Sequence, residues 1–157
     1  MTVAAQVLLI VIDILVVLTL SIGTGAVAPR WPDSWLDADP IPLALGGWET
    51  PAFFRRLRIP RLARRLPELG NTFGGESKSQ LPGTTADHLT AYLREVRRAE
   101  WVHWVSVVGT FVLFAFNPWW LALAFVIVVT AGNLPFILVL RNNRARITRI
   151  IDKDGGR

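Results

Sequence analysis

The chain has 157 residues, of which 52% are hydrophobic and only 18% are charged, and it carries a formal net charge of +5. This length makes one ordinary domain, but the composition is typical of a membrane protein rather than a soluble one. The chain has no cysteine and two histidines, which excludes disulfides, thiol nucleophiles and cysteine-ligated metal centres and leaves too few imidazoles for a typical zinc site. We therefore expect no metal and no cofactor.

The first predicted element is a membrane-spanning helix over residues 3–28. This stretch carries a single charge, on Asp13, and exceeds the about 20 apolar residues that a span requires. The sequence Ala26-Val27-Ala28 resembles a signal-peptidase site, but no basic residue precedes the apolar stretch and Pro29 would follow the cut, which favours a retained helix. Asp13 lies at the middle of the predicted span, where no charged partner is evident, so it is either a functional residue or a protonated group that hydrogen-bonds another helix.

Residues 29–83 are predicted to form a cytoplasmic segment at the membrane interface. From Phe53 to Pro67 apolar and basic residues interleave in two short helical pieces split by Pro60, a pattern that favours contact with anionic lipid. Residues 70–83 are rich in glycine and serine and predict a loop. The first part of the segment excludes a long helix and favours the membrane surface because it holds five prolines and three tryptophans: Pro29, Pro32, Pro40, Pro42 and Pro51, with Trp31, Trp35 and Trp48.

A helix over residues 84–100, with a capping pattern at Thr84, is predicted to lead into the second span. The apolar stretch from Trp101 to Leu140 is too long for one span and predicts two, over 101–117 and 119–140, joined by a turn at Asn117-Pro118. Residues 141–157 are predicted to be a basic cytoplasmic tail. The expected fold is an all-α integral membrane protein with three transmembrane helices, and residues 1–157 form a single membrane domain.

The lysines and arginines predict the orientation of the chain. None precedes Arg30, eleven lie between Arg30 and Arg98, none lies between Glu100 and Leu140, and six follow from Arg141 onward. By the positive-inside rule, the N-terminus and the turn at Asn117 lie outside, and the middle region and C-terminus are cytoplasmic. We therefore expect a multi-pass protein of the cell membrane whose basic residues meet anionic membrane lipids, with no nucleic acid as partner.

The predicted topology brings polar residues at the start of the second span close to those at the end of the third. His103 lies about one turn inside an apolar span near Glu100, which can fix its tautomer, so a general base is one interpretation and a hydrogen-bonded interfacial pair is the other. Asn133 precedes Pro135, whose missing N–H predicts a kink with or without a binding role. The converging residues are Glu95, Arg98, Glu100, His103 and Trp104 on one side, and Asn133, Arg141, Asn143 and Arg144 on the other.

The same residues resemble a known family. The two groups form motifs that are similar to those of the glycosyl-4,4′-diaponeurosporenoate acyltransferase family of staphyloxanthin-type carotenoid synthesis, and they cover residues 95–144. Gly47-Trp48-Glu49, the basic stretch ending at Pro67, and Lys78 resemble weaker family features. The chain departs from the family pattern at Phe136, Leu140 and Asn142, which affects the expected substrate more than the site. The resemblance implies a small integral membrane O-acyltransferase that esterifies a hydroxyl of a glycosylated lipid or terpenoid.

Two hypotheses follow for the function. In the first, His103 with Glu100 or Glu95 activates an acceptor hydroxyl against an acyl donor such as acyl-CoA, which is a co-substrate. The substrate-binding residues are then Arg98, Arg141 and Arg144 for donor phosphates and Asn133 and Asn143 for a carbonyl, with Trp104 in the same site. In the second, the protein is a non-catalytic scaffold or lipid-binding subunit whose polar cluster joins the helices. The sequence is compatible with a homo-oligomer in either case.

Overall fold

A computed structural model describes residues 2–66 and 86–154 of the chain. Throughout these ranges the regular structure is helical, which confirms the predicted all-α class. The predicted loop at 70–83 and the predicted cap at Thr84 lie outside the described residues. The elements, in chain order, are α1 (Val3–Val27), the 3-10 helices η1 (Ala28–Arg30) and η2 (Asp33–Trp35), α2 (Pro51–Arg56), α3 (Ile59–Ala63), α4 (Ala86–Gly109), the 3-10 helix η4 (Thr110–Ala115) and α5 (Trp119–Asp154).

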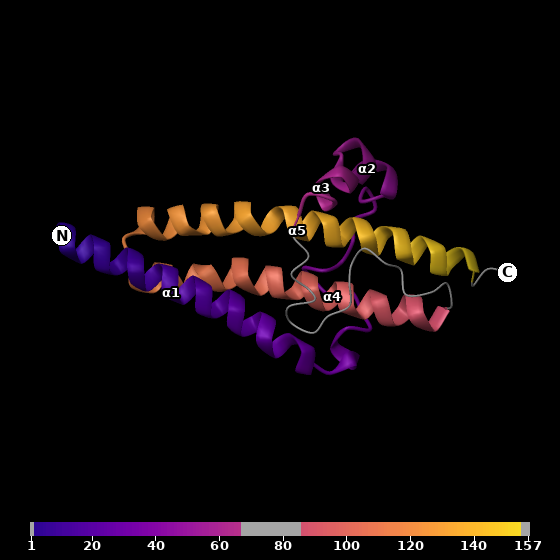
Figure 1. Cartoon of the computed structure of the whole chain (residues 1–157), viewed down its shortest axis with the longest axis horizontal. Helices are drawn as coiled ribbons and strands as arrows, with labels where there is room; N and C mark the ends of the chain where they lie inside the picture. The colour runs from indigo at the N-terminus through magenta and orange to yellow at the C-terminus, as the bar shows by residue number, and fades with distance from the viewer. Residues whose placement is uncertain (1, 67–85, 155–157) are drawn as a thin grey trace.

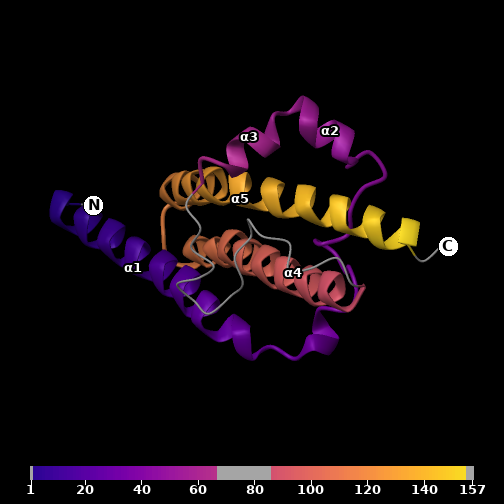
Figure 2. The same cartoon turned by 45° about the vertical axis from the view of Figure 1, so that its right-hand side comes forward.

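Three long helices form the body of the molecule (Figures 1 and 2). α4 and α5 run antiparallel and pack along each other, and α1 lies against α4 and η4. The turn predicted at Asn117-Pro118 is confirmed, because η4 ends at Ala115 and α5 begins at Trp119. α1 approaches α4 closely at Gly109, where an added Cβ would lie 3.2 Å from Leu20. A glycine at this position lets the two backbones come near each other.

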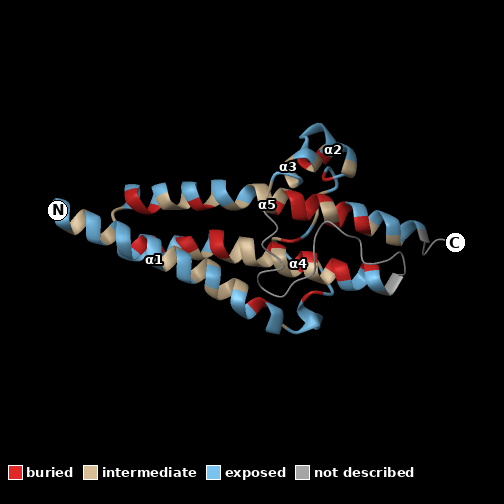
Figure 3. Ribbon diagram, viewed as in Figure 1, coloured by how far each residue is buried: buried red, intermediate tan, exposed pale blue. Residues whose placement is uncertain are grey.

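Within the described residues two helices, not the expected three, are long and apolar enough to cross a membrane: Val3–Arg30 and Trp119–Lys153. Only 6% and 17% of their most apolar windows are buried, so their apolar side chains face outward (Figure 3), unlike those of a core helix in a soluble protein. Both observations indicate a membrane protein. The predicted span over 101–117 is not a helix of this kind. The first part of α4 is polar, its apolar part runs only from Trp101 to Gly109, and the chain then tightens into η4.

α2 and α3 form a small unit beside α5. Phe54 and Ile59 are buried and pack against Val139 and Ala145 of α5. The two helical pieces predicted here are present, but the break lies at Leu57 and Arg58 rather than at Pro60. Proline is favoured in the first turn of a helix because that turn needs no N–H donor there, so Pro60 starts α3 instead of ending it. Arg58 makes the corner with a positive φ of 58°.

The residues after Leu140, predicted to be a tail, are helical up to Asp154. α5 continues without interruption from the apolar stretch through Arg141 to Asp154. Pro135 lies inside this helix. The basic residues after Leu140 therefore extend the same helix that carries the apolar span, and their side chains keep a fixed rotational relation to it.

Candidate functional site

The carboxylate of Glu100 on α4 is fully buried and joins α4 to α5. Its Oε1 accepts a hydrogen bond from Arg141 Nη1 at 2.8 Å, and its Oε2 accepts one from Arg144 Nη1 at 2.5 Å. Arg141 and Arg144 are three residues apart, so α5 presents both on one face. Hydrogen bonds between charged groups are about twice as strong as neutral ones, so this arrangement fixes the two helices to each other.

Arg141 has a second set of partners in the irregular segment between η2 and α2. Its Nε and Nη2 donate to the two carboxylate oxygens of Glu49, the first at 2.5 Å. Its Nη1 and Nη2 also donate to the carbonyl oxygens of Pro42 and Ala44, at 3.0 and 2.7 Å. The prolines keep this segment out of a long helix, which leaves those carbonyl oxygens available to a guanidinium. Arg141 is thus held between two carboxylates.

Arg144 is enclosed in the same way. Its Nη1 donates to the carbonyl oxygen of Leu43 at 2.8 Å, and its Nη2 lies 2.8 Å from Asp39 Oδ1. Its side chain is 1% exposed. A ligand phosphate at Arg141 or Arg144 would compete with these carboxylates, and the expected role of the two arginines in binding an acyl donor stays a prediction.

The carboxylates of the segment keep their charge because of these partners. Burial raises the pKa of Glu49, but the hydrogen bonds from Arg141 and from the Gly46 N–H lower it by more, so its pKa lies below the ordinary 4.5. The pKa of Asp39 is likewise below its ordinary 3.8, since the effect of burial is outweighed by the hydrogen bond from Arg97 and the charge of Arg144. Both side chains are therefore anions at neutral pH.

A second row of ion pairs joins the same segment to the polar part of α4. Arg94 pairs with Asp37 at 2.6 Å, and Arg97 pairs with Asp39 at 2.6 Å and donates to the carbonyl oxygen of Leu36. Arg98 lies between Glu95 and Asp33. We call residues 33–49 the acidic strap, because four acids of this segment, Asp33, Asp37, Asp39 and Glu49, hold five arginines of α4 and α5, namely Arg94, Arg97, Arg98, Arg141 and Arg144.

His103 lies one helical turn beyond Glu100, in the apolar part of α4. Its Nδ1 lies 2.8 Å from Asn133 Oδ1, and its ring stacks on Phe136 with the centroids 5.0 Å apart. The Nδ2 of Asn133 donates to the carbonyl oxygen of Val129 at 2.8 Å. This bond leaves the Asn133 oxygen facing the imidazole, so His103 Nδ1 carries the hydrogen.

The structure brings the predicted residues together in two levels rather than one pocket. Asn133 and Arg141 are eight residues apart, about 12 Å along α5. Glu100, Arg141 and Arg144 form the charge cluster, and His103 pairs with Asn133. Trp104 Nε1 is 3.4 Å from Glu100 Oε1, Glu95 pairs with Arg98, and Asn143 is half-buried on α5 outside these contacts.

Several of the partners in this site have no direct signal in the sequence. The acids of the strap are not regularly spaced, so their positions do not predict which arginines they pair with. Only one of them, Glu49, lies in a sequence that resembles a family feature. Asp13 is fully buried and accepts a hydrogen bond from Asn117 Nδ2 at 2.8 Å. Its partner is therefore the amide of the turn, which a search for opposite charges does not find.

The fold and the site define a helical protein with two helices able to cross a membrane and a buried charge cluster at the polar ends of α4 and α5. The chain belongs to the glycosyl-4,4′-diaponeurosporenoate acyltransferase family, whose profile matches residues 32–153. The match includes the strap, all of α4, and α5 up to Lys153, and it confirms the resemblance found in the motifs. No curated protein and no solved structure matches the chain. The family is named for an acyltransferase of carotenoid biosynthesis.

Proposed function

We propose that this protein is a membrane O-acyltransferase that moves a fatty acyl group onto a hydroxyl of a glycosylated lipid or terpenoid, with His103 as general base. Family membership supports acyl transfer. The observation that carries the role of His103 is its 2.8 Å contact with Asn133, whose amide is itself oriented by Val129. With the hydrogen on Nδ1, the lone pair of the neutral imidazole is on Nε2, the form that a general base requires.

The reaction follows from this protonation state. Nε2 of His103 takes the proton of the acceptor hydroxyl. At the same time the hydroxyl oxygen forms a bond to the carbonyl carbon of an activated acyl donor such as acyl-CoA. The bond from that carbon to the leaving group then breaks, and the leaving group departs with the electron pair and receives the proton from the imidazolium. In this proposal Asn133 takes the orienting role that the sequence favoured for Glu100 or Glu95.

The position of His103 suits a lipid acceptor. It is two residues from Trp101, where the polar part of α4 gives way to its apolar part, and α5 changes character at a similar level, after Leu140. An acceptor with a sugar headgroup and an apolar tail can place the sugar beside the polar parts of these helices and the tail beside their apolar parts. Phe136, stacked on the imidazole, keeps one ring face in an apolar environment.

We further propose the orientation that the basic residues favour, with the polar ends of α4 and α5 in the cytoplasm and the turn at Asn117 outside. The absence of lysine and arginine before Arg30 and between Glu100 and Leu140 supports it. The residues from Trp101 to Phe116 lie against both α1 and α5 and would follow them through the bilayer. Asp13, bonded to Asn117, would then lie near the outer side.

A scaffold function is the second candidate. The observation that favours it is that the arginines at the charge cluster are paired with protein groups, which joins helices but does not require a substrate. A scaffold needs no acyl donor. The two candidates therefore differ in whether the purified protein turns over.

The test compares two histidines of α4. Lipid analysis of cells with and without the gene identifies an acylated glycolipid that depends on the protein, and the purified chain in nanodiscs is then assayed with that acceptor. His103→Gln should lower turnover by about 10²–10⁴-fold while the protein stays folded, and His88→Gln, at an exposed position of the same helix, should not change it. Wild-type turnover in His103→Gln would refute the mechanism, and no turnover in the wild type would favour the scaffold.

A further inference from the structure

Six arginines of the α2–α3 unit are exposed, and no acidic residue pairs with them in the parts of the chain that the structure describes. Between Pro51 and Leu66 the sequence contains no aspartate or glutamate. None of the six forms an ion pair with another residue in the described parts of the chain. We call them the arginine array: Arg55, Arg56, Arg58, Arg61, Arg64 and Arg65.

The array contrasts with the arginines that meet the acidic strap. Those five are paired, and the strap provides their counterions from within the chain. The array is attached to the same helix, α5, yet no acid among residues 2–66 and 86–154 pairs with it. A cluster of like charges destabilises a fold through mutual repulsion unless anions from outside neutralise it.

The position of the α2–α3 unit along α5 indicates where the external anions lie. Phe54 and Ile59 pack against α5 at Val139 and Ala145, with Leu138 at the edge of this contact. The apolar stretch of α5 ends at Leu140, and from Trp119 it is about 33 Å long at 1.5 Å per residue, close to the about 30 Å of a hydrocarbon core. The unit therefore projects sideways from the bundle (Figure 1) at the level of the lipid headgroups.

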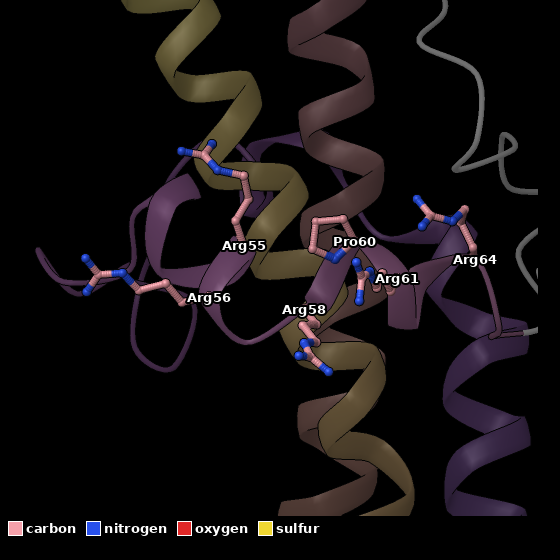
Figure 4. A pocket seen from close by; sticks show the side chains of 6 residues that line it. All are labelled: Arg55, Arg56, Arg58, Pro60, Arg61 and Arg64. Carbon is pink, nitrogen blue, oxygen red and sulfur yellow. The ribbon is translucent and has the colours of Figure 1, made fainter.

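The side chains are arranged as a surface rather than as a closed site. Most of the array lines an open depression of about 450 Å³, which Pro60 also lines. Figure 4 shows Arg55 and Arg56 directed to one side, Arg64 on the other, and Arg58 and Arg61 between them. Such a spread suits several separate phosphates better than one small ligand. Leu57, at the corner between the helices, is 51% exposed and adds an apolar contact of the kind that interfacial segments use.

We propose that the arginine array docks the α2–α3 unit onto the phosphates of anionic lipid headgroups in the membrane that holds α1 and α5. The array is the recognition surface, and the headgroups supply the counterions that the described residues do not provide. Arg58 is central to it, because its positive φ turns the chain so that α2 and α3 both present arginines. A non-glycine residue in this conformation is strained, and such strain is found where function requires it. This inference does not depend on acyl transfer.

The test uses the whole chain in nanodiscs. The natural sequence has no cysteine, so Ala52→Cys, at an exposed position of α2, gives a single labelling site. Quenching of a fluorophore there by headgroup spin-labelled lipid reports docking, in discs of phosphatidylcholine alone or mixed two to one with phosphatidylglycerol. Docking should occur in the mixed discs and weaken as salt shortens the Debye length. Each arginine removed should shift the docking equilibrium about fivefold, equivalent to about 1 kcal/mol per basic residue at an anionic surface.

Variants separate docking from folding. Arg58→Lys keeps the charge and should dock as the wild type does. Arg58→Gly removes the charge and relieves the positive φ, so it should dock less while the protein melts no lower. A control with Arg146→Gln and Arg149→Gln removes two exposed charges of α5 further from the bilayer and should change docking little.

Three outcomes would overturn the proposal: equal quenching in neutral and anionic discs, no loss of docking when Arg56, Arg61 and Arg64 are changed to glutamine, or an equal loss in the α5 control. A fourth concerns the source of the phosphate. If pyrophosphate or coenzyme A changes the fluorescence in neutral discs and prevents docking at micromolar concentration, the array serves a soluble phosphate ester rather than the membrane.

Discussion

Replacing Glu100 with glutamine should destabilise the protein by about 3–5 kcal/mol, the usual result of removing one partner from a buried charged network. The substitution keeps the shape of the side chain and removes the negative charge between Arg141 and Arg144, whose nitrogens lie 2.8 and 2.5 Å from its oxygens. At an effective dielectric constant of about 20, two unit charges about 4 Å apart attract each other by about 4 kcal/mol. The cost of removing Glu100 from water offsets part of this attraction. Glu49 and Asp39 still hold one arginine each, which limits the loss.

The matched control is Glu95→Gln, one and a half turns earlier on α4. Glu95 pairs with Arg98 at a partly exposed position, with 34% of its side chain accessible, and such a pair contributes only about 0.3–0.5 kcal/mol. Thermal unfolding in one detergent should therefore place Glu100→Gln about 6–20 °C below the wild type and Glu95→Gln within about 2 °C of it. If the two variants melt together, Glu100 does not hold the helices as described.

Three more predictions follow from single contacts. Because the folded-state pKa of Glu49 is lowered, its contribution to stability is present above pH 4.5 and is lost as the pH falls through the folded value, so the difference in melting temperature between wild type and Glu49→Gln should shrink below pH 4.5. Asp13→Leu should cost about 0.6–1.7 kcal/mol in mixed-micelle unfolding by losing the bond to Asn117, and Asp13→Asn should not, since an amide keeps an oxygen for that bond. Gly109→Leu should cost about 1–3 kcal/mol by overpacking against Leu20, and a melting temperature like that of wild type would show that α1 does not approach α4 here.

Regular periodicity and composition explain the parts of the fold that could be predicted. α1 and the turn at Asn117 follow from an apolar run and from a turn dipeptide, and both are local signals. Glu100 meets Arg141 and Arg144 because α4 and α5 form an antiparallel hairpin and the acid and the two arginines lie at the same end of it. His103 and Asn133 meet for the same reason. In an antiparallel helix pair, the register of the helices decides which residues face each other, and the turn that joins the helices sets this register.

The acidic strap could not be predicted, because its contacts depend on an irregular path. Glu49 and Arg141 are 92 positions apart, and no repeat or periodic pattern connects them. The prolines showed only that the segment is not a long helix, and its tryptophans favoured the membrane surface. In the structure Leu36 and Leu43 are fully buried, so the strap packs on the protein, while Trp35 and Trp48 are each 64% exposed. Paired acids and arginines at such separations become visible only when the chain is folded.

The positions of the charge cluster and of His103 both depend on how α4 lies against α5. Glu100 precedes His103 by one turn on α4, and Asn133 precedes Arg141 by about two turns on α5. Any slip between the helices that broke the bonds of Glu100 would also move Nδ1 of His103 away from the Asn133 oxygen. A general base must be held to within about 0.5 Å of its working position. In the proposed enzyme Glu100, Arg141 and Glu49 are therefore positioning residues: they set the register of α4 against α5, and that register sets which imidazole nitrogen faces the substrate.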